Sequence, residues 1–154
     1  PLGGVVVSGR VADPFWNQEG NPFIHGTTYA GHPTCCAAAM ANMDILERED
    51  LFTVALEVER HLDSAVGALA THPLVREVRS GVGVMAAVEL TEEALTERGI
   101  TTAEVFQEAR ARGVILRPIP KALLISPPLI ITWEQIDHLV STLAAALDAV
   151  AARH

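Results

Sequence analysis

The 154 residues are 49% hydrophobic and 19% charged, and their formal net charge is -8. This composition is typical of a packed globular protein and argues against intrinsic disorder. The acidic balance argues against a nucleic-acid partner, because phosphate binding needs a basic face. No apolar run approaches the ~20 residues that span a bilayer, so we expect neither nucleic-acid nor membrane binding.

The first residues predict a buried strand. Residues 3–8 read GGVVVS, a short apolar run that contains three consecutive β-branched side chains. No signal-peptide pattern is present there, and a strand needs neighbours, so we expect the chain to be the back portion of a longer protein. An irregular stretch is predicted over residues 13–23, where Pro14, Gly20 and Pro22 stand in turn-like settings.

Two helices are predicted next. The first covers residues 33–48, with Pro33 as the first helical residue, where its missing N–H costs nothing. The second covers residues 51–69, in which apolar side chains recur at spacings of three and four and define one buried face.

Four short strands are predicted in the second half of the chain. Residues 75–80 and 83–90 form a hairpin that turns at SGVG. Residues 114–118 and 122–126 follow as two further strands around a proline-containing turn.

Two more helices complete the prediction. One covers residues 102–112 and ends at Gly113. The last begins after Thr132, which stands three residues before Gln135, the spacing of a capping box. Its expected apolar face consists of Ile136, Leu139, Val140, Leu143, Leu147 and Val150.

These elements predict an α/β chain in three parts. Residues 1–32 are expected to be the end of a larger α/β domain, because one strand and a loop do not make a core. Residues 33–49 form a linking helix, and residues 50–154 form a small α+β domain in which helices cover a sheet.

The loop over residues 23–33, FIHGTTYAGHP, has the composition of an anion site. Free N–H groups and the positive end of the helix dipole favour a phosphate where the loop enters the helix. Thr27 and Thr28 can each donate a hydroxyl hydrogen bond. Alternatively, these hydroxyls only satisfy their own backbone, as they often do in turns.

Other reactive side chains in this region are interpreted structurally. His25 and His32 are seven residues apart on a loop without a third ligand nearby, so we expect packing roles rather than a metal site. Cys35 and Cys36 are adjacent and the only cysteines, which suits a reducing cytoplasm and small apolar positions in an Ala-rich helix.

The segment HGTTYAGHP and the Ala-rich helix after it resemble the class III family of pyridoxal-phosphate-dependent aminotransferases. They resemble in particular its ω-transaminase-like members, which pair an amine donor with a keto acid such as pyruvate. Three further blocks with the same resemblance occur in the expected order: PLGGVVVS, RSGVGVMAAVEL, and GVILRPIPKALLISPPLIIT with EQIDHLVSTLAAAL.

This resemblance implies a fold and a reaction. The fold is the C-terminal part of a fold-type I transferase: the end of its large α/β domain, the long linking helix and the small C-terminal domain. The reaction moves an amino group from an amine or ω-amino acid to a 2-oxo acid with pyridoxal 5'-phosphate as cofactor, in a homodimer with shared active sites.

The resemblance also implies roles for three residues. Thr28 matches the family's residue that binds the cofactor phosphate in the active site of the partner subunit. Thr27 stands where such enzymes shape the substrate pocket, and Arg117 matches an arginine that binds the substrate carboxylate. A planar guanidinium can hold a carboxylate through two parallel hydrogen bonds; a surface arginine at a strand end is the alternative.

The catalytic lysine of the family has no counterpart in this sequence. Transamination needs a lysine that forms a Schiff base with the cofactor. The single lysine, Lys121, lies in a different context and is interpreted as a solvated residue. The Schiff-base lysine is therefore expected upstream of Pro1, and this chain alone is expected to be inactive.

Two alternatives remain open at this point. The chain could serve as a non-catalytic dimerisation or interaction module derived from the same fold. A same-fold aminomutase or decarboxylase would keep the cofactor and change the reaction, and fold alone does not decide between chemistries.

Overall fold

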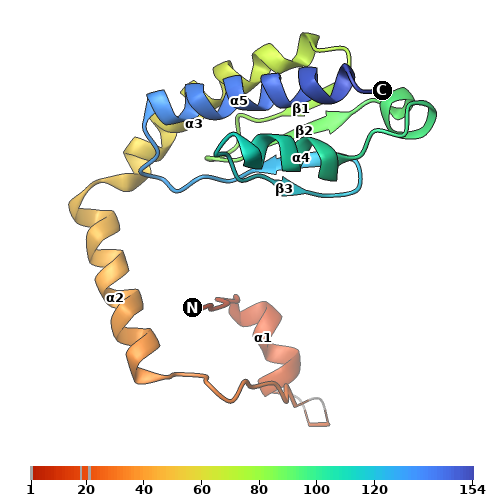
Figure 1. Ribbon diagram of the computed structural model, residues 1–154. Helices are drawn as coiled ribbons and strands as arrows, with labels where there is room; N and C mark the ends of the chain where they lie inside the picture. Colours follow the sequence, from red (N-terminus) through yellow and green to blue (C-terminus); the bar gives the residue numbers. More distant parts are fainter. Residues whose placement is uncertain (1, 18, 21) are drawn as a thin grey trace. The chain divides into compact units, whose positions relative to one another are not determined.

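The structure, a computed structural model, describes residues 2–17, 19–20 and 22–154 (Figure 1). The chain divides into two compact units, Pro1–Glu49 and Asp50–His154. The first unit contains the helices α1 (Gly9–Trp16) and α2 (Pro33–Arg48). The second contains three helices, two short helical segments and four strands: α3 (Leu51–Gly67), η1 (Ala68–Thr71), β1 (Val75–Arg79), β2 (Ala86–Leu90), η2 (Glu93–Glu97), α4 (Thr102–Ala111), β3 (Arg117–Pro118), β4 (Ala122–Ile125) and α5 (Trp133–Ala151).

The helix α2 has the bounds that the sequence predicts. Pro33 is its first residue, and the backbone N–H of Cys36 donates to the carbonyl of His32 at 3.0 Å to close the first turn. None of the described residues in the first unit is buried, so this unit has no core of its own.

Two predictions for the first unit are wrong. Residues 3–8 form no strand, and Val5 and Val6 are 88% and 101% exposed. A strand is stabilised by hydrogen bonds to a neighbouring strand, and the described part of this unit contains none. The stretch expected to be irregular begins with helix instead, because α1 includes residues 13–16 despite Pro14. Val11 and Phe15, four residues apart, fall on one side of this short helix and line the same apolar hollow.

The second unit is built on one antiparallel sheet with the strand order β1-β2-β4-β3. The predicted β1–β2 hairpin is confirmed, although β2 begins at Ala86 rather than at residue 83, and its register shifts between Val75 and Glu77. The strand expected over residues 114–118 is shorter than predicted, since only Arg117 and Pro118 pair with β4.

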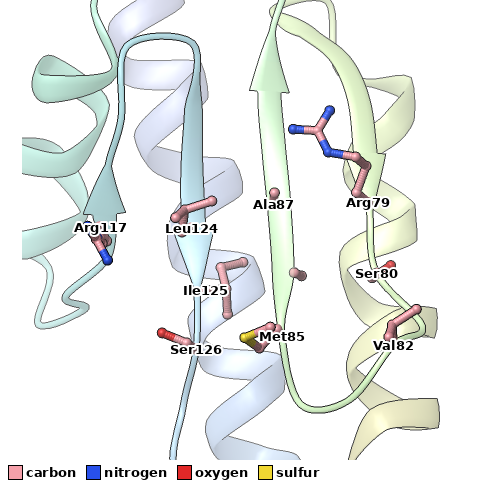
Figure 2. Close-up of a pocket in the computed structure, with 10 residues that line it drawn as sticks. Arg79, Ser80, Val82, Met85, Ala87, Arg117, Leu124, Ile125 and Ser126 are labelled. Carbon is pink, nitrogen blue, oxygen red and sulfur yellow. The ribbon is translucent and has the colours of Figure 1, made fainter. Parts of the chain in front are cut away.

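The helices α3, α5 and α4 cover one face of this sheet, and Figure 2 shows them behind the strands. The side chains of Val88 and Leu123, which are cross-strand partners, are fully buried against them. The other face, called the open face below, carries the alternate positions Glu77, Arg79, Ala87, Glu89, Leu124 and Arg117.

The core of the second unit joins all three helices to the sheet. The predicted apolar face of α5 is confirmed, with Leu139 half-buried and the others buried. The largest fully buried side chains are Leu62, Leu74, Leu90, Ile100, Leu123, Ile125, Ile136, Leu143 and Leu147. Burying side chains of this kind contributes about 1.5–3 kcal/mol each, which fixes the sheet beneath the helices.

The predicted cap of α5 is also confirmed. The N–H of Gln135 donates to Oγ1 of Thr132 at 3.3 Å, and the N–H of Thr132 donates to Oε1 of Gln135 at 3.0 Å. Each bond satisfies a backbone donor that the helix itself leaves free.

Among the described helices, none has both the length and the apolar character needed to cross a bilayer.

The turn between β1 and β2 is held to α3 by two carboxylates. Gly81 and Gly83 have φ values of 79° and 67°, in the left-handed region that glycine tolerates. The hydroxyl of Ser80 donates to Asp63 at 2.5 Å, and the N–H of Gly83 donates to Glu59 at 2.7 Å. The turn is thereby fixed relative to the helix layer.

Candidate functional site

The loop that enters α2 consists of two successive turns. The N–H of Ala30 donates to the carbonyl of Thr27 at 3.0 Å, and the N–H of His32 donates to the carbonyl of Tyr29 at 3.1 Å. Gly31 has a φ of 68°, which allows the second turn. Thr27 and Thr28 are both exposed, and their hydroxyls make no hydrogen bond to the described residues.

The start of α2 adds backbone donors to this loop. The N–H groups of the N-cap residue and of the first three helical residues have no acceptor within a helix. His32 donates to Tyr29 and Pro33 has no N–H, so Thr34 and Cys35 supply the free groups. The side chain of His32 does not cap the helix. Two threonine hydroxyls, free N–H groups and the helix dipole form a donor set that fits a phosphate.

The two histidines of this loop contact aromatic rings. The His25 ring lies 5.8 Å from that of Phe23, and the His32 ring lies 5.6 Å from that of Tyr29. Nδ1 of His32 is buried without a hydrogen-bond partner among the described residues. The described residues contain no group of three or more metal-ligating side chains.

The second unit contains a pocket of about 380 Å³ on the open face of the sheet (Figure 2). Most of its lining is apolar, and two arginines and two serines supply the polar groups. The lining residues are Arg79, Ser80, Val82, Met85, Ala86, Ala87, Arg117, Leu124, Ile125 and Ser126.

The two arginines stand at opposite ends of one cross-strand row. Arg79 on β1 pairs with Ala87 on β2, Ala87 pairs with Leu124 on β4, and Leu124 pairs with Arg117 on β3. Paired residues of an antiparallel sheet point to the same face. Figure 2 accordingly shows the two arginines on the outer strands, with Ala87 and Leu124 between them.

Arg79 belongs to a network of ion pairs. It donates to Glu77 and to Glu89 at 2.6 Å each, and Arg76 donates to Glu89 at 2.7 Å. The side chain of Glu89 is only 13% exposed. The hydrogen bond from Arg79 lowers the pKa of Glu89, and the bond to Glu89 raises the pKa of Arg79, so both groups stay charged.

Arg117 differs from Arg79 in having no such partner. It is exposed, and it makes no ion pair or hydrogen bond with the described residues. It also borders a second hollow of about 390 Å³, which Pro127, Pro128 and Leu139 help to line. Its guanidinium is therefore available to an anion.

The structure places the predicted site residues in different units. Thr27 and Thr28 lie in one turn of the first unit, and Arg117 lies on β3 of the second. Lys121 is exposed and pairs with Glu92 at 3.0 Å, as expected of a solvated residue. Arg79 and Glu89 are not among the residues predicted from the sequence, although the alternation in VREVR indicates that Glu77 and Arg79 share a face.

The mixed α and β architecture and the loop before α2 are consistent with the family that comparison with known proteins identifies. The profile of the family Aminotransferase class-III matches residues 1–147, and the chain belongs to this family.

Among curated relatives, a putrescine–pyruvate aminotransferase of Pseudomonas aeruginosa is 38% identical over 99% of this chain and 34% of its own. A diaminobutyrate–2-oxoglutarate transaminase of Halomonas elongata is 35% identical over 97% of this chain and 34% of its own. An omega-aminotransferase of Caulobacter vibrioides is 33% identical over 97% of this chain and 34% of its own. The chain thus spans about one third of the length of these relatives.

Solved structures that match this chain are also transaminases, and the chain again covers about one third of each. A thermostable (S)-enantioselective omega-transaminase from Thermomicrobium roseum matches with a TM-score of 0.79 and 33% identity, covering 94% of this chain and 33% of that one. A transaminase from an ancestral-reconstruction study matches with a TM-score of 0.77 and 40% identity, covering 89% of this chain and 32% of that one. The expected fold class, part of a pyridoxal-phosphate-dependent transferase, is confirmed.

Proposed function

We propose that this chain is the C-terminal portion of a class III aminotransferase that moves an amino group from an amine or ω-amino acid to a 2-oxo acid. The match of the family profile over residues 1–147 carries the proposal. The substrates named for the relatives, putrescine with pyruvate and diaminobutyrate with 2-oxoglutarate, belong to these classes.

The loop before α2 is assigned to the phosphate of pyridoxal phosphate. Thr28 donates its hydroxyl to the phosphate, in the active site of the partner subunit of a homodimer. Its exposure and its lack of a protein partner among the described residues support this role. The cofactor, when bound, supplies the electron sink for amino-group transfer.

Arg117 is assigned to the carboxylate of the substrate, and Thr27 to the wall of the substrate pocket. The exposed, unpaired guanidinium of Arg117 at an apolar pocket supports the first assignment. A bidentate pair with a carboxylate fixes its orientation as well as its position. An uncharged amine makes no such pair, so Arg117 contributes less to its binding.

The Schiff-base lysine is assigned to the part of the protein that precedes these residues. Lys121 is the single lysine of the chain and lies in an exposed ion pair with Glu92, which favours a solvated role. In this proposal residues 1–32 end the large domain, residues 33–49 link the domains and residues 50–154 form the small one. The two free cysteines support a cytoplasmic location.

Arg117→Ala in the full-length protein tests this function. Activity is measured separately with a 2-oxo acid and with an uncharged amine as the varied substrate. We expect a loss of about tenfold or more in kcat/KM for the 2-oxo acid, since a hydrogen bond to a charged group contributes about 1.5–3 kcal/mol, and a small loss for the amine.

Arg60→Ala is the matched control, because Arg60 is exposed on α3 and has no ion pair to the described residues. It should leave both values unchanged. Equal losses for both substrates in Arg117→Ala would show that Arg117 acts structurally, and absence of aminotransferase activity in the parent protein would refute the function itself.

A further inference from the structure

Arg117 stands on a short strand at the edge of the sheet (Figure 2). The strand β3 consists of Arg117 and Pro118 alone, and β4 is its one partner strand among the described residues. Proline has no N–H, so neither Pro118 nor the nearby Pro120 donates a hydrogen bond to β4. A guanidinium that binds a carboxylate has to be positioned to within about 0.5 Å, so β3 needs support from another element.

The two prolines make the segment that carries Arg117 stiff. Arg117, Pro118, Ile119 and Pro120 follow one another in the sequence. The ring of each proline fixes its φ, and a residue that precedes a proline is restricted to extended conformations. All four residues are therefore restricted. A contact that fixes Ile119 also limits where Arg117, two residues or about 7 Å away, can lie.

The side chain of Thr102 makes such a contact. Its hydroxyl donates to the carbonyl of Ile119 at 2.8 Å. Thr102 is only 6% exposed, so little water competes for this hydrogen bond. The same carbonyl accepts from the N–H of Ala122 at 3.3 Å, and the N–H of Ile119 donates to the carbonyl of Ala122 at 2.8 Å. The turn between β3 and β4 is thereby joined to α4.

The helix α4 gives Thr102 a fixed position. Thr102 is its first residue, and the preceding Thr101 forms a capping box with Glu104. The N–H of Glu104 donates to Oγ1 of Thr101 at 3.2 Å, and the N–H of Thr101 donates to Oε2 of Glu104 at 2.8 Å. Val105 and Ala109 are fully buried in the core. The two adjacent hydroxyls therefore differ in role, since that of Thr101 caps the helix and that of Thr102 holds the turn.

We propose that Thr102 is a positioning residue for Arg117: through the carbonyl of Ile119, it holds the guanidinium where it binds the carboxylate of the 2-oxo acid. This inference rests on the proposed function, which assigns that carboxylate to Arg117. Thr102 lines neither of the two hollows that Arg117 borders, so it acts on the substrate through β3. A valine has nearly the shape of a threonine, and Thr102→Val removes the hydrogen bond with little change in packing.

Thr102→Val in the full-length protein tests the inference. KM and kcat are measured separately for pyruvate and for putrescine, the substrates in the name of the Pseudomonas aeruginosa relative. Without the hydrogen bond, β3 occupies the binding position for a smaller fraction of the time, and the apparent affinity falls by that fraction. We expect KM for pyruvate to rise about fivefold, as for the loss of one neutral hydrogen bond. The kcat, and KM for putrescine, which has no carboxylate, should stay nearly unchanged.

Three further variants show whether the effect depends on the hydroxyl and on Arg117. Thr102→Ser keeps the donor and should restore most of the affinity for pyruvate. Thr102→Val combined with Arg117→Ala should be no worse with pyruvate than Arg117→Ala alone, and a further fall of about fivefold in the combined variant would overturn the inference. Thr142→Val is the matched control, because Thr142 on α5 is the other buried threonine among the described residues, and it should change neither KM.

The remaining outcomes are also decisive. Thermal unfolding and cofactor content verify that each variant is folded. If Thr102→Val is not, Thr102→Ala serves instead, because it removes the hydroxyl without placing a methyl group against the carbonyl of Ile119, and the same rise in KM for pyruvate is expected. An unchanged KM for pyruvate in the folded variant, or equal losses with pyruvate and putrescine, refutes the inference. If Arg117→Ala still impairs pyruvate selectively in that case, the proposed function stands without it.

Discussion

His61 on α3 stacks on Trp133 at the start of α5, with their ring centroids 5.2 Å apart and their planes inclined by 14°. Nε2 of His61 also lies 2.8 Å from Oδ1 of Asp137, one turn further along α5. Both rings lie at the surface, and Trp133 is 56% exposed. One histidine therefore joins the two longest helices of the second unit at the point where α5 begins.

Trp133→Ala should loosen this junction. An aromatic pair contributes about 0.5–1.5 kcal/mol beyond area burial, so the free energy of local opening at the start of α5 should fall by about 1 kcal/mol. Hydrogen exchange of the α5 amides in the full-length protein measures this opening. Phe52→Ala is the control, because Phe52 is 66% exposed on α3 and pairs with no described aromatic ring; an equal effect there would contradict the role of stacking.

Thr132→Ala should destabilise the first turn of α5. It removes the acceptor for the N–H of Gln135, and loss of such a cap costs about 1 kcal/mol. The amide of Gln135 should exchange roughly fivefold faster, while the last turn of α5 is unaffected. Thr132→Ser keeps the acceptor and should retain most of the protection. Identical exchange in the alanine and serine variants would show that the cap contributes nothing.

Gly81→Ala should destabilise the β1–β2 turn. The φ of Gly81 is 79°, and an added Cβ would lie 3.4 Å from Oδ1 of Asp63. The left-handed conformation alone costs about 1–2 kcal/mol for a residue with a side chain. Gly67→Ala is the matched control, since Gly67 lies in α3 with nothing within 4 Å of an added Cβ. The urea midpoint should fall for Gly81→Ala and hold or rise for Gly67→Ala; the reverse order would contradict the assigned backbone strain.

Acid should weaken the packing of α4. The pKa of Glu104 is lowered by hydrogen bonds from the backbone and hydroxyl of Thr101, and that of Glu108 by bonds from Arg112 and Arg153. A carboxylate whose pKa is lower in the folded state stabilises it fully above the unfolded value of 4.5, and this stability is lost as the pH falls through the folded value.

Urea midpoints measured between about pH 6 and about pH 3 check this dependence. They should decrease over the acidic part of the range, and Glu108→Gln should reduce the slope. Midpoints that do not depend on pH between these limits, in both proteins, would contradict the assigned ion pairs.

The sequence predicts best the elements whose signals are local. Pro33 marks the start of α2, and the spacing of Thr132 and Gln135 marks the start of α5. The apolar period of α5 identifies the face that the core buries. Each signal depends on residues within two or three turns, so no knowledge of distant contacts is needed.

The sequence does not predict structure that depends on contacts between residues far apart in the chain. Val5–Val7 read as a strand, yet in the described part of the first unit no strand is available to pair with them. The contact of Arg79 with Glu89 depends on the hairpin register, which the shift between Val75 and Glu77 alters. Thr27, Thr28 and Arg117 could be named only through their resemblance to a family, because an exposed side chain without a partner has no distinctive local pattern.

The central claim, that the loop before α2 holds the phosphate of pyridoxal phosphate, is tested most directly by the cofactor affinity of Thr28→Ala. The dissociation constant is measured in the full-length protein, with Thr53→Ala, an exposed threonine on α3, as the control. The account predicts at least about tenfold weaker binding for Thr28→Ala, from the loss of one hydrogen bond to a charged group, and unchanged binding for Thr53→Ala. An unchanged dissociation constant in Thr28→Ala would contradict it.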